Sequence, residues 1–553
     1  MMLKGSQAIV KLLEEQGVET IFGYPGGAVI PLFDALYDSD IKKVLTAHEQ
    51  GAIHAADGFA RASGKVGVCI ATSGPGATNI VTGLATAYLD SIPLVAITGQ
   101  VGVNMLGRDS FQEIDITGVT LSVTKYNMLI RKKEDLIPGL RKAFRVAKEG
   151  RPGPVLVDVP SSIQNEIIDY PALVQKPLNK TRANDPDLFE EIAAAINKAK
   201  RPVLLVGGGA INSEAQEELV ALANRADIPV ASTLMGLGVF PASDEHCLGL
   251  TGMHGHICGN MAVTQADVLI VVGSRFSDRV TGDRNSYAGE KTIIQLEIDL
   301  SEIDKNVMVD HFLLGDAKSN LAQLLPLINE AKHEDWWKQI KEWAGTEAWA
   351  LVKVDRLTAP NMMEILNKEF AGKNPVYVTD VGQNQMWAAQ YLKIDKPRHH
   401  LTSGGCGTMG FGLPGALGAS FANKESQVIS ISGDGGFKMT GMELYTAARE
   451  GRKLISIVVN NSCLGMVRQW QHLFYDRRYS STILTEFDFI GFAKSCGADG
   501  MRVTTCEEFT QALKKAQASE KPFVIEALVE QGDMVDPMVA AGAKINDFVD
   551  TFR

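Results

Sequence analysis

The sequence predicts an α/β protein made of three doubly wound parallel-sheet domains. Short apolar segments alternate with helical patterns along the chain, and many of these segments end in glycine-rich turns. Continuous apolar runs are typical of strands buried on both faces, and their alternation with helices indicates parallel sheets covered on both sides. The chain has 553 residues, which is too long for one hydrophobic core. We therefore place three domains, at residues 1–168, 185–345 and 356–553.

The first domain shows the alternation of strands and helices most clearly. Apolar segments predict strands at residues 18–22, 44–46, 66–71, 94–98 and 155–159. Helical patterns lie at residues 7–16, 31–37 and 51–63. Two of the strands lead into polar or glycine-rich segments, at residues 48–50 and 72–79. Ligands bind beyond the carboxyl ends of strands in open parallel sheets, so we expect part of a site there.

The middle and last thirds of the chain repeat this pattern. Strands are predicted at residues 203–206, 268–272, 293–298, 376–379, 428–432 and 456–459. The polar segment 170–186 contains three prolines and indicates a linker. The charged segment 332–355 contains tryptophan and indicates a helical connector. No obvious sequence repeat relates the three units.

Composition limits the partners and the compartment. The net charge is −11 and the isoelectric point is near 5.5, which argues against a nucleic-acid partner. The seven cysteines are widely spaced and form no Cys-x-x-Cys motif, which indicates a reduced protein. No apolar segment reaches transmembrane length, and the first residues predict an amphipathic helix rather than a cleaved leader. We expect a cytoplasmic protein that binds neither nucleic acid nor a membrane.

The most informative stretch is a turn in the last domain that follows a buried strand. It places a carboxylate among glycines that let the backbone approach a phosphate, namely Gly433, Asp434, Gly435 and Gly436. The next predicted strand leads to Asn461, after a segment long enough for one helical crossover. A magnesium ion that carries a diphosphate takes few protein ligands, and carboxylate and amide oxygens suit it. A lone Gly-Asp-Gly is usually a solvated turn, but this pairing of strand ends is the pattern of thiamine diphosphate enzymes.

Glu49 lies between a short predicted strand and a predicted helix. Taken alone, it is best interpreted as a first-turn carboxylate that stabilises the helix. Beside a thiamine diphosphate site it has a chemical interpretation as well. A buried carboxylate bonded to N1′ of the aminopyrimidine favours the imino tautomer, which removes the C2 proton of the thiazolium. The neighbouring segments 48–52 and 73–76 favour this second interpretation.

The chain resembles the catalytic subunits of acetohydroxyacid synthase, also called acetolactate synthase, over essentially its whole length. The resemblance rests on residues 22–28, 48–52, 72–79, 111–113, 151–155, 252–255, 275–282, 407–410 and 465–471. The last of these segments is much more particular to this family than the Gly-Asp-Gly turn. The resemblance implies a thiamine diphosphate-dependent transferase that decarboxylates pyruvate and joins the hydroxyethyl unit to a second 2-keto acid. Its products would be 2-acetolactate from pyruvate and 2-aceto-2-hydroxybutyrate from 2-ketobutyrate, in valine and isoleucine biosynthesis.

The resemblance also assigns the thiamine diphosphate site. Glu49 would activate the cofactor from one subunit, and the other subunit would hold Mg²⁺ through Asp434, Asn461 and the carbonyl of Cys463. The smallest active form would therefore be a homodimer, with dimer against tetramer left open. The residues that would line the cofactor are Gly382, Gln383, Asn384, Gly407, Met409, Gly433, Gly435 and Gly436. Met409 would lie under the bent cofactor, whereas without the family it is interpreted as a core methionine.

On the substrate side, the resemblance places Gly27, Phe111, Gln112, Met466, Val467 and Trp470. Trp470 would form a wall of the acceptor pocket and favour 2-ketobutyrate over pyruvate. One methylene is worth roughly 1–3 kcal/mol in such a pocket, so the preference can be large. Taken alone, Trp470 is equally well interpreted as a core aromatic residue.

The middle domain is predicted to bind a dinucleotide. A strand ends in three glycines, although glycines at strand ends are common. The resemblance makes the ligand FAD, in a structural role because the overall reaction transfers no net electrons. The residues that would bind it are Arg151, Gly207, Gly208, Gly209, His254, Arg275, Asp299 and Asp316. The resemblance also leaves open a separate regulatory small subunit as a partner.

Three positions depart from the family pattern. Ser161 replaces a lysine near the substrate channel, Asn384 replaces a histidine that contacts the diphosphate, and Ser277 replaces an aspartate of the flavin segment. An amide still donates hydrogen bonds, so we expect a mild effect at Asn384. Three alternatives stay open: an FAD-free fermentative acetolactate synthase, an enzyme resembling pyruvate oxidase or decarboxylase on the same scaffold, and a scaffold protein without catalysis. The predicted catalytic and metal-binding residues are all present, so the last carries little weight.

Overall fold

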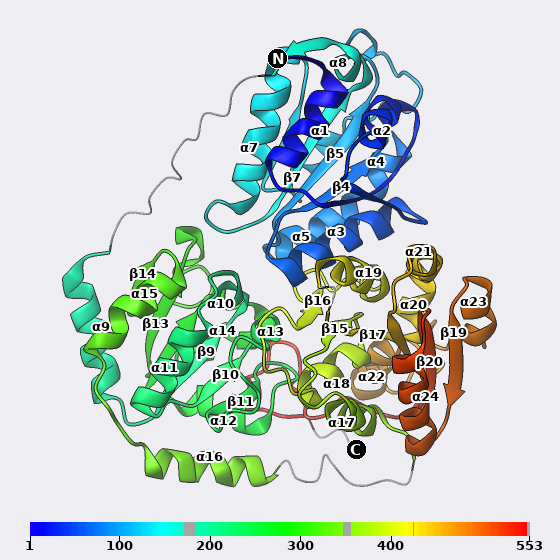
Figure 1. Cartoon of the computed structure of the whole chain (residues 1–553). Coiled ribbons are helices and arrows are strands. Elements are labelled where there is room, and N and C mark those ends of the chain that lie inside the picture. The colour runs from blue at the N-terminus through cyan, green and yellow to red at the C-terminus, as the bar shows by residue number, and fades with distance from the viewer. Residues whose placement is uncertain (171–183, 347–355, 424, 550–553) are drawn as a thin grey trace.

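The computed structural model describes residues 1–170, 184–346, 356–423 and 425–549. Within these residues, each third of the chain forms one six-stranded sheet with helices on both faces, shown in blue, green and yellow to red in Figure 1. Every strand pairing inside the three sheets is parallel. The predicted α/β class with three doubly wound sheets is confirmed. Most of the predicted linker at residues 170–186 and the end of the predicted connector at 332–355 lie outside the described residues.

The first sheet lies in residues 20–160. Its strands are β2 (Thr20–Tyr24), β3 (Lys42–Leu45), β4 (Gly67–Ala71), β5 (Leu94–Gln100), β6 (Tyr126–Leu129) and β7 (Pro154–Pro160), in the order β3-β2-β4-β5-β7-β6. The helices around it are α1 (Gly5–Glu15), α2 (Ile30–Tyr37), α3 (Glu49–Ser63), α4 (Pro75–Asn79), α5 (Val81–Leu89), α6 (Ile116–Thr120), α7 (Leu136–Lys148) and α8 (Ser161–Asn165). A separate antiparallel pair joins β1 (Met2–Lys4) to β8 (Ile167–Asp169).

The middle sheet lies in residues 202–314. Its strands are β9 (Pro202–Val206), β10 (Val230–Ser232), β11 (Cys247–Leu250), β12 (Val268–Val272), β13 (Thr292–Glu297) and β14 (His311–Leu314), in the order β11-β10-β9-β12-β13-β14. Its helices are α9 (Pro186–Lys198), α10 (Gly208–Asn212), α11 (Gln216–Ala226), α12 (Ile257–Gln265), α13 (Asp278–Thr281), α14 (Arg284–Tyr287), α15 (Ala317–Leu324) and α16 (Glu334–Thr346).

The last sheet lies in residues 376–528. Its strands are β15 (Val376–Thr379), β16 (His400–Thr402), β17 (Val428–Gly433), β18 (Ile455–Asn460), β19 (Asp499–Val503) and β20 (Phe523–Leu528), in the order β16-β15-β17-β18-β20-β19. Its helices are α17 (Ala359–Glu369), α18 (Gln383–Tyr391), α19 (Gly412–Ala422), α20 (Asp434–Thr440), α21 (Glu443–Arg449), α22 (Gly465–Phe474), α23 (Phe489–Ser495) and α24 (Cys506–Ala518). Among the helices in the described ranges, none has the length and apolar character needed to cross a membrane.

The strand orders locate the crevices where ligands bind. When the strands of each sheet are numbered along the chain, the first and last sheets share one order, 2-1-3-4-6-5, and the middle sheet has the order 3-2-1-4-5-6. The middle order is typical of dinucleotide-binding folds. In each sheet the connections change direction between two neighbouring strands, and a crevice opens beyond their carboxyl ends. These neighbours are β2 with β4, β9 with β12, and β15 with β17.

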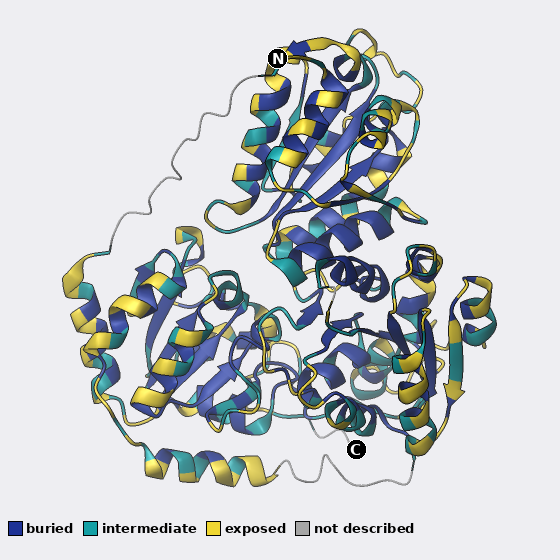
Figure 2. Cartoon of the chain, in the orientation of Figure 1, coloured by how far each residue is buried: buried dark blue, intermediate teal, exposed yellow. Residues whose placement is uncertain are grey.

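One hydrophobic core joins the first sheet to the last. The helices α3 and α19 pack against each other in this core, and both are almost entirely buried (Figure 2). Their backbones approach closely, because a β carbon on Gly418 would overlap the carbonyl oxygen of Ala55. The helix that begins at Glu49 is therefore fixed against the last third of the same chain.

Candidate active site

The first half of the candidate site lies beyond β2 and β4, around Glu49. This residue begins α3, two residues before the predicted helix start, and its side chain is 13% exposed. Asn79 donates a hydrogen bond from Nδ2 to Glu49 Oε2 at 3.0 Å. Within the described residues Oε1 makes no hydrogen bond and is available to a ligand. The position thus satisfies both interpretations of Glu49, as a first-turn carboxylate and as a group that can meet a cofactor.

Thr72, at the end of β4, connects the neighbouring strand ends. Its Oγ1 accepts a hydrogen bond from the main-chain N–H of Ala28 at 3.2 Å. A β carbon on Gly76 would lie 3.3 Å from Glu49 Oε1, so the turn after β4 passes close to this carboxylate. The structure thereby brings Gly27, the turn after β4 and Glu49 to one edge of the first sheet.

Gln112 and Phe111 belong to a longer connection that returns over the same edge. Gln112 has a left-handed backbone with φ of 60°, and its Cβ lies 2.8 Å from the place of a β carbon on Gly74. Gln112 is therefore held against the turn that precedes α4. Phe111 is 88% exposed.

The second half of the candidate site lies beyond β17 and β18. These strands are neighbours, with Gly433 paired to Val459, so Asp434 and Asn461 follow adjacent strand ends. Asp434 is 3% exposed, and burial raises its pKa to about 6. A buried carboxylate without a paired cation is costly, so this position suits a metal ion. Asn461 Oδ1 accepts a hydrogen bond from the main-chain N–H of Cys463 at 3.3 Å, which keeps two of the three predicted metal ligands in one turn.

The donor set indicates which metal ions fit. The described residues hold no group of three or more His, Cys, Asp or Glu side chains arranged to bind a metal ion. One carboxylate, one amide oxygen and one carbonyl oxygen instead suit a hard cation that takes its other ligands from a phosphate. The second half-site therefore fits Mg²⁺ held together with a diphosphate.

Gln383 and Asn384 begin α18 beside these strand ends. Gln383 Oε1 accepts a hydrogen bond from Asn461 Nδ2 at 3.0 Å, and its Nε2 donates to Gln469 Oε1 at 2.9 Å. Asn384 Nδ2 donates to the carbonyl oxygens of Asp380 and of a residue in β17, at 2.9 and 3.0 Å. Both amide hydrogens are thus used within the chain. This differs from the expectation that the amide of Asn384 would donate to a diphosphate.

Asp380 and Asn79 are residues that sequence reasoning missed. Asp380 follows β15, is 1% exposed, and has its pKa raised to about 6 by burial. Its carboxylate accepts hydrogen bonds from the main-chain N–H groups of Val381, Gly410 and Gly412. It thereby fixes the turn that carries Met409, whose methyl carbon lies 3.4 Å from the place of a β carbon on Gly435. The available signal was its position directly after a predicted strand, at the same sheet edge as the metal ligands.

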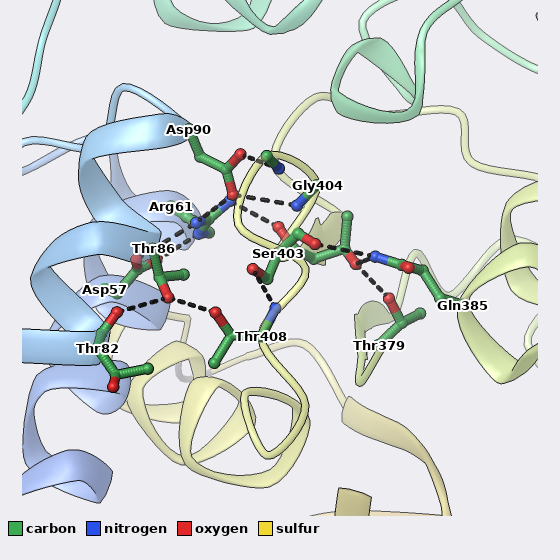
Figure 3. A network of polar contacts seen from close by, with 12 residues as sticks. Asp57, Arg61, Thr82, Thr86, Asp90, Thr379, Gln385, Ser403, Gly404 and Thr408 are labelled. Carbon is green, nitrogen blue, oxygen red and sulfur yellow. Dashed lines mark hydrogen bonds and ion pairs between the residues drawn. The ribbon is translucent and has the colours of Figure 1, made fainter. Parts of the chain in front are cut away.

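A buried polar network anchors the loop at residues 402–408 to the first domain, as Figure 3 shows. Arg61 of α3 pairs with Asp57 and, at 2.9 Å, with Asp90. Arg61 also donates a hydrogen bond to the carbonyl oxygen of Thr402 at 2.7 Å. Asp90 accepts hydrogen bonds from two main-chain N–H groups of the loop, at 3.1 and 2.7 Å. The loop is therefore held by charged groups of the first domain.

The far end of this loop is fixed by hydroxyl groups. Thr408 Oγ1 lies 2.6 Å from Thr86 Oγ1, and its main-chain N–H donates to Ser403 Oγ at 3.0 Å. Gln385 Nε2 donates to Thr402 Oγ1 at 2.7 Å (Figure 3). This loop contributes to the wall of the cavity described in the next paragraph, and it leads directly into the turn that carries Met409.

A cavity of about 1500 Å³ opens between the middle sheet and the other two parts of the chain. Most residues predicted to bind a dinucleotide line it, namely Arg151, Gly207, Gly208, Gly209, His254, Arg275 and Asp316. The same cavity is lined by Gly382, Gly407, Met466, Val467 and Trp470. It thus reaches from the crevice of the middle sheet to the edge of the metal half-site. The residues of the first half-site, Gly27, Glu49, Phe111 and Gln112, are not among those that line it.

The chemistry of the cavity fits a dinucleotide. Gly207 follows β9 at the point where the middle sheet changes direction. His254 is 8% exposed, and its Nδ1 has no hydrogen-bond partner within the described residues. Burial lowers the pKa of His254 to about 4, so the ring offers a neutral polar atom to a ligand. Asp299 does not line the cavity, because it caps a turn and lies 3.6 Å from Arg151.

Comparison with known proteins places these sites in a family. Three family models match in chain order: the thiamine pyrophosphate enzyme N-terminal TPP binding domain at residues 3–119, the central domain at 189–324, and the C-terminal TPP binding domain at 380–527. Each match overlaps one of the three sheets.

Curated relatives match along the whole chain. A probable acetolactate synthase large subunit of Methanocaldococcus jannaschii is 46% identical over 100% of this chain and 96% of its own length. An acetolactate synthase large subunit of Corynebacterium glutamicum is also 46% identical, over 99% of this chain and 90% of its own length. One from Haemophilus influenzae is 40% identical over 99% and 98%. With two intact strand-end sites and full-length similarity, the chain belongs to the acetolactate synthase large-subunit family of thiamine pyrophosphate enzymes.

Proposed function

We propose that this protein is an acetolactate synthase, a transferase that decarboxylates pyruvate on thiamine diphosphate and joins the hydroxyethyl unit to pyruvate or 2-ketobutyrate. The observation that carries the proposal is the agreement between full-length relatives of that name and the two strand-end sites around Glu49 and Asp434. The products would serve valine and isoleucine biosynthesis. All seven cysteines are free thiols, which supports a cytoplasmic location.

The residues of the two half-sites have complementary tasks in this reaction. When bound, thiamine diphosphate supplies the thiazolium that accepts the electron pair released by decarboxylation. Asp434, Asn461 and the carbonyl oxygen of Cys463 are placed to hold Mg²⁺ and, through it, the diphosphate. Glu49 presents Oε1 for a hydrogen bond to the pyrimidine ring, and Asn79 fixes the orientation of its carboxylate. Glu49 would there hold or release a proton at the atom that faces the ring.

We assign the cavity beside the middle sheet to FAD in a structural role. The strand order of that sheet, the glycine turn after β9 and the unpaired Nδ1 of His254 support this assignment. Ser277, which replaces the family aspartate, also lines the cavity and keeps a polar side chain at that wall. Arg275 adds positive charge for a diphosphate group, and Arg151, which is paired with Glu302 at 2.7 Å, lines the same cavity.

We assign the acceptor pocket to the start of α22. Met466, Val467 and Trp470 line the cavity at its end nearest the metal half-site. The indole of Trp470 packs edge-on against Phe474, with ring centroids 5.5 Å apart, which limits its rotation. A rigid aromatic wall of this kind favours an acceptor with one more methylene. Gly27 and Gln112 would contact the substrate from the other half-site.

We infer that two copies of the chain pair to complete each site. Large apolar side chains are exposed on the first and last domains, which carry the half-sites, among them Phe111, Leu121, Met439, Met442, Tyr445, Val467 and Ile483. Exposed apolar surface of this extent is typical of an interface. Covering it with a second copy would bring Glu49 of one chain to the metal half-site of the other, in a dimer or in a tetramer built from dimers. The relatives are named large subunits, which supports a separate regulatory small subunit as a further partner.

A spectrum and a product assay test the proposed function. The purified protein would be assayed with thiamine diphosphate and Mg²⁺, first with pyruvate alone and then with added 2-ketobutyrate. We expect a flavin spectrum, acetolactate in the first assay and 2-aceto-2-hydroxybutyrate in the second. Acetolactate without bound flavin would overturn the FAD assignment and identify a fermentative enzyme. Acetaldehyde or peroxide as the main product would overturn the reaction while leaving the cofactor site in place.

A further inference from the structure

We propose that Glu443 is a positioning residue that fixes the backbone from which the Glu49 carboxylate projects; the inference rests on the function proposed for Glu49. Glu443 is the first residue of α21 and is 1% exposed. Its Oε1 accepts hydrogen bonds from the main-chain N–H groups of Ala47 and His48, both at 3.2 Å. These are the two residues that directly precede Glu49. A carboxylate of the last domain thus binds the entry of the helix on which Glu49 begins.

The surroundings of Glu443 hold its carboxylate in one place. Thr446 Oγ1 donates a hydrogen bond to Glu443 Oε2 at 2.7 Å, one turn further along α21. Gly51 faces the carboxylate from the first turn of α3, and a β carbon there would overlap Glu443 Oε1. Any residue larger than glycine at position 51 would therefore displace the carboxylate. The fit between Gly51 and Glu443 indicates a built contact rather than a chance approach of two domains.

The contact has a clear electrostatic reason. The first N–H groups of a helix and of the residues before it have no partner within the helix, and the helix dipole makes this end positive. A buried carboxylate from another element satisfies two of these donors at once. Because hydrogen bonds to a charged acceptor are stronger than neutral ones, the two bonds from Ala47 and His48 to Glu443 hold the start of α3 against α21.

The position of α3 matters because the Glu49 carboxylate is held by a fixed partner, Asn79. The hydrogen bond from Asn79 to Glu49 Oε2 leaves Oε1 for the cofactor, so a shift of the backbone changes where Oε1 points. A displacement of about 1 Å can cost about a hundredfold in rate when a reacting group must be aligned. Glu443 also follows α20, which begins with Asp434. One α20–α21 segment therefore fixes a metal ligand at one end and the Glu49 helix at the other.

The test replaces Glu443 in the full-length protein by Glu443→Gln, which keeps the size but removes the negative charge and one of the two acceptor oxygens. We expect kcat to fall about tenfold to a hundredfold with little change in the KM for pyruvate. Exchange of the C2 proton of bound thiamine diphosphate, followed by NMR after acid quench, should slow by a similar factor. In the protein without cofactor, amide hydrogen exchange should speed up in the peptide that contains residues 47 and 48. Affinity for thiamine diphosphate and flavin content should change little.

Two further variants keep this test decisive. Thr446→Val removes only the hydroxyl that steadies Glu443, and we expect a smaller loss of kcat and C2 exchange in the same direction. Glu218→Gln on α11 removes a largely buried carboxylate far from this contact and serves as the matched control, with kcat and C2 exchange unchanged. If Glu443→Gln folds and leaves both the C2 exchange and the amide exchange unaltered, Glu443 does not position Glu49.

The Glu49→Gln variant distinguishes a failure of the function proposed for Glu49 from a failure of the positioning role proposed for Glu443. If Glu49→Gln itself leaves C2 exchange unchanged, the function proposed for Glu49 fails, whatever Glu443 does. If Glu49→Gln abolishes exchange while both Glu443→Gln and Thr446→Val match the Glu218→Gln control, only the positioning role of Glu443 is overturned.

Discussion

Buried carboxylates that accept main-chain N–H groups recur at the residue scale in this protein. Asp380 holds the turn that carries Met409, Asp90 holds the loop at residues 402–408, and Glu443 holds the entry to α3. Burial raises the pKa of Asp380 and of Glu443, and hydrogen bonds from main-chain N–H groups offset part of that cost. The three carboxylates thus hold turns and loops in fixed positions close to the proposed cofactor sites.

The effect of burying a carboxylate can be tested at Asp158 in β7, through the dependence of protein stability on pH. It is 1% exposed, accepts a hydrogen bond from Thr98 Oγ1 at 2.7 Å, and has its pKa raised to about 7 by burial. Because the folded pKa lies above the unfolded value, the folded protein retains a proton that the unfolded chain releases. The contribution of protonated Asp158 to the free energy of unfolding is fully present below about pH 4. It is lost as the pH rises toward about 7, by at most about 1.4 kcal/mol per pH unit.

Asp158→Asn cannot ionise, so we expect its unfolding free energy to fall less steeply with pH than that of the wild type. Urea unfolding at several pH values between about 4 and 7 measures the slope. The exposed Asp38→Asn variant is the control and should keep the wild-type slope. Equal slopes for Asp158→Asn and the wild type would show that Asp158 is ionised in the folded protein.

Trp470 is the residue on which acceptor choice should depend. Replacing the indole by a smaller side chain in Trp470→Leu enlarges the pocket and removes the wall that contacts the extra methylene of 2-ketobutyrate. We expect the ratio of 2-aceto-2-hydroxybutyrate to 2-acetolactate to fall about tenfold, which corresponds to roughly 1.4 kcal/mol. Product analysis with both acceptors present gives this ratio. Phe474→Leu touches only the far side of the indole and should change the ratio less; an unchanged ratio in Trp470→Leu would place the acceptor elsewhere.

At the element scale, most long apolar runs were predicted as strands, whereas several short or half-exposed strands were not. The predicted strands at residues 268–272 and 376–379 coincide with β12 and β15. The edge strands β6 and β19 are largely half-exposed, so their sequences lack the continuous apolar run of a strand buried on both faces. Strand-end motifs identified Asp434, Asn461 and the glycine turns, because chemistry and position coincide there. The contacts of Asn79, Asp380 and Glu443 join distant segments and required the tertiary structure.

The loop at residues 402–408 depends on one buried ion network. Asp90→Asn would leave Arg61 with a single carboxylate partner and weaken the hold on two main-chain N–H groups. Breaking a buried pair typically costs about 3–5 kcal/mol, so we expect a clearly lower melting temperature. Flavin retention after gel filtration should also fall, because the loop lines the cavity. Asp169→Asn removes an exposed ion pair and is the control. Equal flavin retention in both variants would show that the loop does not help to hold the flavin.

The packing of α3 on α19 can be tested by adding a single methyl group. In Gly418→Ala the new β carbon would overlap the carbonyl oxygen of Ala55, so the helices must move apart. We expect a loss of about 1–3 kcal/mol in unfolding free energy, together with reduced activity because α3 carries Glu49. Gly345→Ala in α16 is the matched control, since its β carbon would meet no atom within 4 Å. A Gly418→Ala variant as stable as this control would contradict the close packing.

At the scale of the whole molecule, the strand order of each sheet matches the kind of ligand site that we assign to it. The first and last sheets share one order and carry the two halves of the thiamine diphosphate site, and the middle sheet has the order typical of dinucleotide binding. Each chain therefore contains one Glu49 half-site and one Asp434 half-site. The exposed apolar side chains around both halves support a site that two chains complete together.

Co-expression of two inactive variants tests this central claim most directly. Glu49→Gln and Asp434→Asn should each abolish acetolactate formation when expressed alone. If each site takes one half from each chain, a mixed dimer has one fully intact site and one doubly altered site. Random pairing should then restore about a quarter of the wild-type specific activity, because about half of the dimers are mixed. Activity no higher than that of either variant alone, in isolated mixed dimers, would show that both halves of a site come from the same chain.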